Sequence, residues 1–225
     1  MKNIYGVYGA GGFGREVMPL LEEYLVSINE SKENIYFIDD FCDGEYINSL
    51  PIVSYNSFLH LSADERSVTI AIENSNVREK LTNKCLESNV RILGVSATNV
   101  MKLAEVSIGC GAILCPFVTL TSNVKIGKSF QANIYSYVAH DCIIGDYVTF
   151  SPSVRCNGNV VIDDHVYIGT GAIIKQGTSE KPIKIGKGAI ISVGAFVTKN
   201  VPDGVTVFGN PAIELTKENL RKRNG

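Results

Sequence analysis

Apolar residues return at every sixth position over the second half of the chain. Written in sixes from Val106, the sequence runs VSIGCG, AILCPF, VTLTSN and onward without a slip to AIIKQG, which ends at Gly177. A period of six fits neither a helix nor an alternating strand, but it is typical of a parallel β-helix, in which each hexad forms one wall and one corner. The third position of every hexad is apolar and predicts the inward face of the coil: Ile108, Leu114, Leu120, Ile126, Ala132, Val138, Ile144, Phe150, Cys156, Ile162, Ile168 and Ile174.

The pattern stops at "TSEKP", residues 178–182, and then resumes for three more hexads. Twelve hexads before the interruption and three after it make fifteen, and three hexads per coil give five coils. Glycine, asparagine and aspartate recur in the fourth to sixth positions, where corners need positive φ. The alternative, a sandwich, would need fifteen unrelated segments to hold one phase by chance. We therefore expect "TSEKP" to be a loop extruded from the wall of a β-helix.

The first hundred residues carry a different pattern, in which strand and helix signals alternate. Short β-rich runs at 3–8, 34–40, 67–74 and 90–95 are separated by helix-prone segments at 14–27 and 75–88. This alternation predicts βαβ units and a parallel sheet. We expect a small Rossmann-like α/β domain over residues 1–98, a β-helix over 99–212 and a C-terminal tail over 213–225.

Composition narrows the range of partners. The 225 residues carry a formal net charge of −2 and the basic residues are scattered, which argues against a nucleic-acid-binding protein. No apolar stretch approaches the roughly 18 residues of a membrane span, and the chain starts directly in a strand pattern, so we expect no membrane partner and a cytoplasmic location. Six cysteines without a CxxC pair favour reduced thiols over disulfides or a zinc site.

Three glycines between the first strand and the first helix have the spacing of a dinucleotide-binding turn. Gly9-x-Gly11-x-x-Gly14 is followed by Asp39 and Asp40 at the end of the next strand. Only about eighty residues remain before the repeats, which is short for a complete dinucleotide domain, so we expect no NAD. Such a turn still points backbone N–H groups at an anion, which leaves two interpretations: a nucleotide site, or a tight turn that only packs helix on strand.

Three histidines are candidates for acid–base chemistry. His60 lies outside the repeats and His165 at a corner, and we expect both to be solvated surface residues. His140 occupies the fifth position of its hexad with Asp141 beside it, and imidazole titrates near neutral pH, as a general base must. On these residues alone, a solvated corner histidine remains the other interpretation.

Tandem hexads of the form [LIV]-G-x-x-x-x, closed by "VTKNVPDGVTVFGNPA", resemble the left-handed β-helix acyltransferases. With the small α/β domain in front, the whole chain is similar to the bacterial nucleotide-sugar acetyltransferases of PglD/NeuD type. The resemblance implies a homotrimer with acetyl-CoA bound between adjacent subunits. It also implies N-acetylation of a nucleotide-linked amino sugar, a 4-amino-4,6-dideoxyhexose, for glycan biosynthesis.

The same resemblance implies which residues hold the nucleotide sugar. Gly11, Gly12 and Phe13 match the loop around the diphosphate, and Asp39 and Asp40 match acidic residues near the nucleoside. This assignment makes the glycine turn a substrate site rather than a cofactor site.

Further matches concern the acceptor sugar and acetyl-CoA. Glu73 and Asn74 stand where the family commonly has Gly-Asn, and a carboxylate there leaves the identity of the base and sugar open. Asn133 aligns with an asparagine near the acceptor sugar. Thr149 replaces a histidine of the PglD pattern, and the residues matched to acetyl-CoA binding are Thr149, Thr170 and Val193.

For the chemistry, the resemblance makes His140 the general base and Asp141 the neighbour that increases its basicity. One coil is eighteen residues, so Gly158 should lie above His140 and could offer its backbone N–H to an oxyanion, although a corner glycine chosen only for φ is equally compatible. No metal and no covalent enzyme intermediate are required.

Two other functions stay open. The same base could O-acetylate a sialic-acid-type sugar, or the chain could be a non-catalytic β-helix that binds nucleotide sugars as a scaffold. O-acetylation gives an ester and N-acetylation gives an amide, so the chemistry of the product separates the first alternative from N-acetylation. Replacement of His140 tests the scaffold alternative.

Overall fold

The computed structural model describes residues 2–42 and 44–224, with side chains described up to residue 221. The chain divides into two compact units: the residues up to Thr98 together with Cys110–Ile113, and Asn99–Gly109 together with the chain from Leu114 onward.

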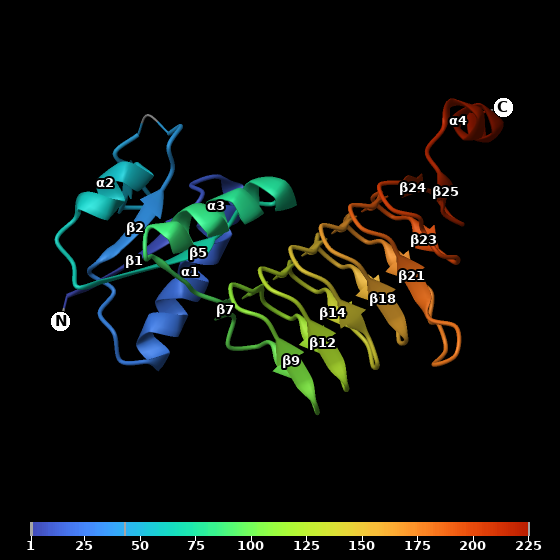
Figure 1. Ribbon diagram of the computed structural model, residues 1–225, viewed down its shortest axis with the longest axis horizontal. Coiled ribbons are helices and arrows are strands. Elements are labelled where there is room, and N and C mark those ends of the chain that lie inside the picture. The colour runs from blue at the N-terminus through green and yellow to red at the C-terminus, as the bar shows by residue number, and fades with distance from the viewer. Residues whose placement is uncertain (1, 43, 225) are drawn as a thin grey trace. The chain divides into compact units, whose positions relative to one another are not determined.

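The first unit is a mixed sheet with helices in its crossover connections (Figure 1). Strands lie in the order β3-β4-β2-β1-β5-β6, and every pair is parallel except β3 with β4. The strands of this sheet are β1 (Asn3–Tyr8), β2 (Ile35–Ile38), β3 (Tyr46–Ile47), β4 (Leu50–Val53), β5 (Glu65–Ile70) and β6 (Arg91–Ile92). The strand β7 (Val95–Ser96) lies outside it and pairs with β10 (Ile113–Leu114). The helices are α1 (Gly12–Ser27), α2 (Tyr55–His60) and α3 (Ser75–Glu87).

Burial explains why the predicted elements form. Val7, Phe37 and Val68 lie at the centre of three neighbouring strands and are fully buried, and α1 buries Val17 and Leu21 against the unit's interior. The sequence pattern missed β3, β4 and α2, which are short. Ser54 was the available signal for α2, since its hydroxyl accepts the Ser57 N–H at the helix N-terminus.

The second unit is a parallel β-helix, as predicted, and its coils appear in Figure 1 as stacked rungs coloured from green to red. The first wall contains β10 (Ile113–Leu114), β13 (Gln131–Ala132), β16 (Thr149–Phe150), β19 (Tyr167–Ile168), β22 (Ile190–Ile191), β24 (Thr206–Phe208) and β25 (Ile213–Glu214). The second wall contains β8 (Met101–Lys102), β11 (Thr119–Leu120), β14 (Tyr137–Val138), β17 (Arg155–Cys156), β20 (Ile173–Ile174) and β23 (Phe196–Val197). The third wall contains β9 (Val106–Ile108), β12 (Val124–Ile126), β15 (Ile143–Ile144), β18 (Val160–Ile162) and β21 (Ile183–Ile185).

Register within the walls follows the hexad. Tyr137 pairs with Arg155, eighteen residues later, and the same step recurs in each wall until residues 178–182, which form a loop between β20 and β21. Every third-position residue from Leu114 to Ile174 is buried, and Ile108 in the first coil is half-buried. The wall pattern begins earlier than the hexads written from Val106, because β8 already pairs with β11.

Three edges join the walls, and their corner residues adopt positive φ. The first edge, between the first and second walls, is defined by Phe117, Tyr135, Ser153, Gly171 and Gly194. The second edge, between the second and third walls, is defined by Glu105, Asn123, Asp141 and Asn159. The third edge, between the third and first walls, is defined by Ser129, Tyr147, His165, Gly188 and Gly204. Glycine, asparagine and aspartate were predicted here, but the aromatic corners were not.

Residues 213–224 contain more structure than a tail. β25 pairs antiparallel with β24, and the helix α4 (Lys217–Asn224) follows it. Among the helices of the described residues, none is long and apolar enough to cross a membrane.

Candidate active site

A histidine and an aspartate form a hydrogen-bonded pair on the second edge of the β-helix. Nδ1 of His140 lies 2.7 Å from Oδ2 of Asp141, and both side chains are about half exposed (46% and 48%). Asp141 adopts φ +58° at this corner. One coil away, Asn123 Nδ2 donates to the other carboxylate oxygen at 3.3 Å. The imidazole thus sits at the surface with one nitrogen fixed by a carboxylate.

Protonation of the pair follows from these contacts. The hydrogen bond from His140 lowers the pKa of Asp141 below its usual range, and the Asn123 amide acts in the same direction. An ionised carboxylate only accepts hydrogen bonds, so the proton of a neutral imidazole is assigned to Nδ1. Nε2 is then left with a lone pair, which is the arrangement that a general base needs.

Gly158 lies directly over the imidazole, as the eighteen-residue coil predicted. A Cβ built on Gly158 would lie 2.5 Å from both Cε1 and Nε2 of His140, so only glycine leaves room for the ring in this position. The Asn159 N–H donates to the His140 carbonyl at 2.9 Å, which fixes the two coils together at this point. Within residues 2–42 and 44–224, the Gly158 N–H takes part in no hydrogen bond. A backbone donor and a base are therefore adjacent on one edge.

The glycine turn of the first unit leaves backbone open at the N-terminus of α1. Gly9 adopts φ +113°, and a Cβ on Gly14 would lie only 1.8 Å from the Gly9 carbonyl oxygen, so both positions require glycine. Gly11 and Gly12 have open space where a Cβ would be, and Phe13 follows them half-buried in the first turn of the helix. Exposed N–H groups at the start of a helix form a site for phosphate groups.

Asp39 and Asp40 have different surroundings. Asp39 accepts the Ala10 N–H at 3.0 Å, so its carboxylate lies against the glycine turn. Asp40 accepts the Tyr55 N–H at 2.7 Å through one oxygen and the Tyr8 hydroxyl at 2.8 Å through the other, with Lys84 Nζ 3.5 Å away.

The electrostatics of Asp40 reflect these internal bonds. Burial alone would raise the pKa of Asp40, but the Tyr55 N–H, the Tyr8 hydroxyl and the Lys84 ammonium together outweigh it and lower the pKa below its usual range. Burial likewise raises the pKa of Tyr8, which stays a hydrogen-bond donor. The geometry favours Asp39 over Asp40 as the carboxylate nearest a ligand on the glycine turn.

Glu73 and Asn74 follow β5 at the carboxyl edge of the same sheet. Asn74 is the N-cap of α3, since its side-chain oxygen accepts the N–H groups of Asn76 and Val77 at 3.1 Å. The buried Arg78 guanidinium donates to the Ile72 and Glu73 carbonyls and fixes the loop. Glu73 is exposed beside this loop.

Comparisons with known proteins identify relatives of the chain. The family model described as the PglD N-terminal domain matches residues 6–85. GDP-perosamine N-acetyltransferase of Escherichia coli O157:H7 is 46% identical over 215 residues, which cover 96% of this chain and 97% of that protein. The chain belongs to the PglD/NeuD-type acetyltransferases.

Solved structures extend the match to the fold of this acetyltransferase. WeeI from Acinetobacter baumannii AYE is 59% identical with a TM-score of 0.92, covering 95% of this chain and all of that chain (100%). The acetyltransferase domain of PglB from Neisseria gonorrhoeae FA1090, solved in complex with acetyl coenzyme A, is 27% identical with a TM-score of 0.82 over 95% and 99% of the two chains. The β-helix is left-handed, as predicted, and the protein is an acyltransferase.

In this acetyltransferase the residues matched to acetyl-CoA binding lie away from His140. Thr170 and Val193 occupy the first edge in successive coils, where the Gly194 N–H donates to the Thr170 carbonyl at 2.9 Å, and Val193 is 72% exposed. Thr149 lies in β16 and is buried in the first wall. Asn133 also belongs to the first edge, where its side-chain oxygen accepts the Ile134 N–H. The chain therefore does not bring these residues to the His140 edge.

The other histidines of this acetyltransferase have separate surroundings. His60 is exposed at the end of α2, as predicted. His165 was predicted to be solvated, but it is half-buried and its ring stacks on Tyr147 at 5.3 Å on the third edge.

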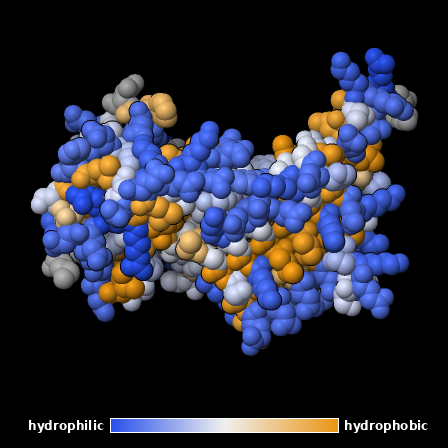
Figure 2. Space-filling model, in the orientation of Figure 1, coloured by the Kyte–Doolittle hydropathy of each residue, from blue (hydrophilic) through white to orange (hydrophobic). Residues whose placement is uncertain are grey.

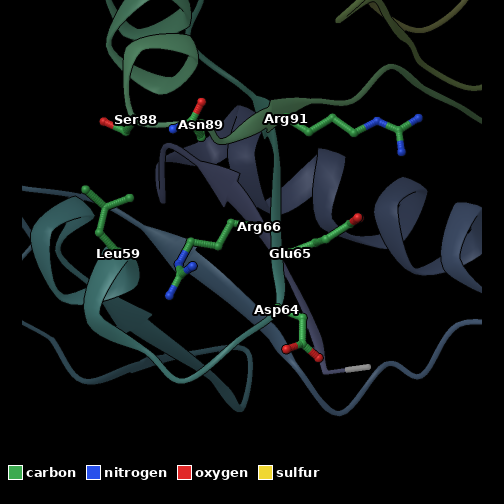
Figure 3. A pocket seen from close by; sticks show the side chains of 7 residues that line it. All are labelled: Leu59, Asp64, Glu65, Arg66, Ser88, Asn89 and Arg91. Carbon is green, nitrogen blue, oxygen red and sulfur yellow. The ribbon is translucent and has the colours of Figure 1, made fainter.

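A polar hollow of about 680 Å³ lies at the opposite edge of the first unit's sheet, where β5 and β6 begin (Figure 3). Its lining carries charges of both signs, with Asp64 and Glu65 beside Arg66 and Arg91. Arg66 already donates to the Phe58 and Leu61 carbonyls. Ligands of open parallel sheets bind at the carboxyl edge, so this hollow is not the candidate nucleotide site.

Sequence reasoning missed three residues around the candidate base: Asn123, Tyr137 and Asn157. Each of them is separated along the sequence by close to one coil from His140, from Asp141 or from another of the three. That spacing places residues on neighbouring coils, and it was the signal in the sequence that could have identified them. Among the described residues, no group of three or more histidine, cysteine, aspartate or glutamate side chains could hold a metal ion.

Proposed function

We propose that this acetyltransferase transfers the acetyl group of acetyl-CoA to the amino group of a GDP-linked 4-amino-4,6-dideoxyhexose, such as GDP-perosamine. The observation that carries the proposal is the His140–Asp141 pair beneath Gly158, in a chain 46% identical over nearly its whole length to a GDP-perosamine N-acetyltransferase. N-acetylation of such a sugar serves the synthesis of a surface glycan.

His140 is the general base in this proposal. The acceptor nitrogen attacks the thioester carbonyl carbon, a C–N bond forms, and the proton leaves the nitrogen for Nε2 of His140. Asp141 stabilises the resulting imidazolium through Nδ1. The Gly158 N–H donates to the oxyanion of the tetrahedral intermediate, and collapse breaks the C–S bond and releases CoA, which regains a proton from the imidazolium.

The separation of the two edges supports a homotrimer. His140 and Asp141 lie on the second edge, whereas Thr170, Val193 and Asn133 lie on the first, and the space between the edges is filled by the buried third-position side chains. Acetyl-CoA on the first edge of one chain can reach only the base of another chain. Exposed apolar side chains on the β-helix support the same proposal, and they include Met101, Leu103, Phe117, Ile134, Tyr135, Ile143, Ile190 and Val193. Figure 2 shows apolar patches on the face of the molecule in view.

The first unit binds the nucleotide in this proposal. The open backbone at Gly11 and Gly12 suits a diphosphate at the start of α1, and Asp39 lies against the same turn. Glu73, an acceptor-only side chain at the next strand end, suits a base that presents N–H donors, as the Watson–Crick edge of guanine does.

The test is a reaction panel read by mass spectrometry. Purified protein and acetyl-CoA are incubated with GDP-perosamine, with UDP- and dTDP-linked 4-amino sugars, and with a sialic acid. We expect a gain of one acetyl group on GDP-perosamine that survives hydroxylamine, because an amide resists it and an ester does not. Acetylation of the sialic acid alone, with loss on hydroxylamine treatment, would favour the O-acetyltransferase alternative.

His140→Ala separates catalysis from a scaffold role. General base catalysis contributes about 10²–10⁴-fold, so kcat should fall by at least two orders of magnitude while the oligomeric mass by light scattering stays unchanged. His60→Ala is the matched control, since His60 is exposed and lies outside the β-helix that carries His140. Equal kcat of the two variants would show that His140 is not the base, whereas unchanged function of His140→Ala in cells would support the scaffold alternative.

A further inference from the structure

The side chain of Asn157 is held by groups on two neighbouring coils. The Tyr137 hydroxyl, one coil below, donates to Asn157 Oδ1 at 2.9 Å. Asn157 Nδ2 donates to the Ile174 carbonyl, one coil above, at 2.8 Å. Residue 157 immediately precedes Gly158, so these bonds restrain the corner that carries the candidate oxyanion donor.

The backbone carbonyl of Asn157 points into the β-helix. It accepts the Cys142 thiol at 3.2 Å, and Cys142 is fully buried. The Cys156 thiol, also fully buried, lies 3.8 Å from the same oxygen. The hydrogen bond with Cys142, together with burial, raises the pKa of the Cys156 thiol, so it stays protonated inside the coil.

The direction of this carbonyl decides the direction of the Gly158 N–H. The Asn157–Gly158 peptide is trans, and in a trans peptide the C=O and N–H groups point in opposite directions. Because the carbonyl faces the buried thiols, the N–H faces away from them, and Gly158, itself buried, lies against the imidazole of His140. A glycine at a corner has wide backbone freedom, and this peptide could rotate without such restraints.

We infer that Tyr137 and Cys142 are positioning residues that fix the Asn157–Gly158 peptide with its N–H toward the reacting carbonyl. Tyr137 acts from the outer side through the Asn157 amide, and Cys142 acts from the interior through the Asn157 carbonyl. The inference rests on the proposed function, because it assigns the N–H to the oxyanion of acyl transfer.

Kinetics of two variant pairs test the inference. Tyr137→Phe removes only the hydroxyl, and Ser136→Ala is its matched control, since it removes a buried hydroxyl of the same coil that bonds Ser151 and Val154 instead. We expect kcat to fall about tenfold in Tyr137→Phe, with KM for acetyl-CoA and the shape of the pH profile unchanged, because the base and the binding residues are intact.

Cys142 offers a test with a conservative rescue. Cys142→Ala removes the donor to the Asn157 carbonyl, whereas Cys142→Ser keeps a hydroxyl donor at the same place. We expect Cys142→Ala to lose about tenfold in kcat and Cys142→Ser to recover most of it. A purely structural role would lower the melting temperature of Tyr137→Phe and Ser136→Ala alike and leave kcat of the folded enzyme unchanged.

An NMR measurement tests the same inference without enzyme activity. The sequence has two Asn-Gly pairs, 157–158 and 224–225, so labelling asparagine carbonyls with ¹³C and glycine with ¹⁵N selects two amide signals. Asn157→Ala identifies the Gly158 signal by its loss. We expect this signal to shift or split in Tyr137→Phe and Cys142→Ala and to stay in place in Ser136→Ala.

The kinetic and NMR measurements together distinguish a failure of the positioning inference from a failure of the proposed function. An unmoved Gly158 signal in both Tyr137→Phe and Cys142→Ala overturns the positioning inference, whatever the enzyme acetylates. Variants with kcat within twofold of the wild-type protein also overturn it. If the Gly158 signal moves but no sugar of the panel is acetylated, the peptide is positioned as inferred and the proposed function has failed.

Discussion

Gly158→Ala is a direct test of the stacked arrangement at the second edge. The added Cβ would lie 2.5 Å from Cε1 and Nε2 of His140 and 2.9 Å from Nδ1, whereas ordinary contact begins at 3.4 Å. The difference, 3.4 minus 2.5, means that the ring must withdraw by about 0.9 Å. Because the imidazole is about half exposed, it can move into solvent without unfolding the coil.

The kinetic consequence follows from that displacement. A misplacement of about 1 Å at the reacting groups can cost roughly 10²-fold in rate, which corresponds to ~2.7 kcal/mol of transition-state stabilisation. We expect kcat of Gly158→Ala to fall about a hundredfold in a steady-state assay of CoA release, with KM for acetyl-CoA nearly unchanged.

Gly127→Ala is the control for damage to the β-helix. Its Cβ would lie 2.7 Å from the Gly145 carbonyl carbon, so it disturbs another corner without touching His140. We expect Gly127→Ala to lower the melting temperature and to retain kcat below the transition. The reasoning would be refuted by a Gly158→Ala enzyme within threefold of the wild-type kcat, or by an equal loss of kcat in Gly127→Ala.

Three further predictions concern hydrogen bonds and backbone at other positions. Asp40→Asn should lower the free energy of unfolding at pH 7 by ~1 kcal/mol after allowance for solvent screening. Since the folded pKa of Asp40 is depressed, this stability is present above the unfolded pKa of about 3.9 and is lost as the pH falls through the folded pKa. Urea titrations of the wild-type protein and Asp40→Asn should therefore show a larger difference in the free energy of unfolding at pH 7 than at pH 3. An equal difference at both pH values would contradict the prediction. Asn123→Ala removes one of the bonds to Asp141 and should lower kcat about three- to tenfold in the same assay with an unchanged melting temperature, whereas an unaltered kcat would show that Asn123 does not orient the carboxylate. Gly14→Ala places a Cβ 1.8 Å from the Gly9 carbonyl oxygen and should destabilise the first unit by more than ~3 kcal/mol in thermal unfolding, while Gly12→Ala, with open space, should not; equal melting temperatures would contradict this geometry.

The hexad pattern predicted the β-helix because the repeat is a local property of the chain. Each third-position side chain needs only to be apolar to define the inward face, and the burial of Leu120, Val138 and Ile162 confirms that face residue by residue. The same constant step made it possible to predict Gly158 over His140, since in a coil of fixed length a sequence separation is also a vertical distance.

Elements without a period were harder to predict. β3, β4 and α2 are too short to show periodicity, and the aromatic corners Tyr135 and Tyr147 follow from the left-handed conformation that the coil imposes rather than from residue preference. Asn74 matched a substrate residue by its place after a strand, but its side chain caps α3, a use that depends on where the helix begins.

The sequence alone determined the alternation of strands and helices in the first hundred residues and the hexad repeat that follows, with its apolar third position facing inward. It also determined the adjacent His140 and Asp141 and the eighteen-residue coil that places Gly158 over His140. Only the tertiary structure decided which polar groups are already engaged: the two oxygens of Asp40 bond to Tyr8 and Tyr55, and the Asn157 carbonyl turns toward the Cys142 thiol. The physical reason is that a period records which way each side chain faces, whereas hydrogen bonds between segments, and the distances around a filled coil, exist only once the chain has closed on itself.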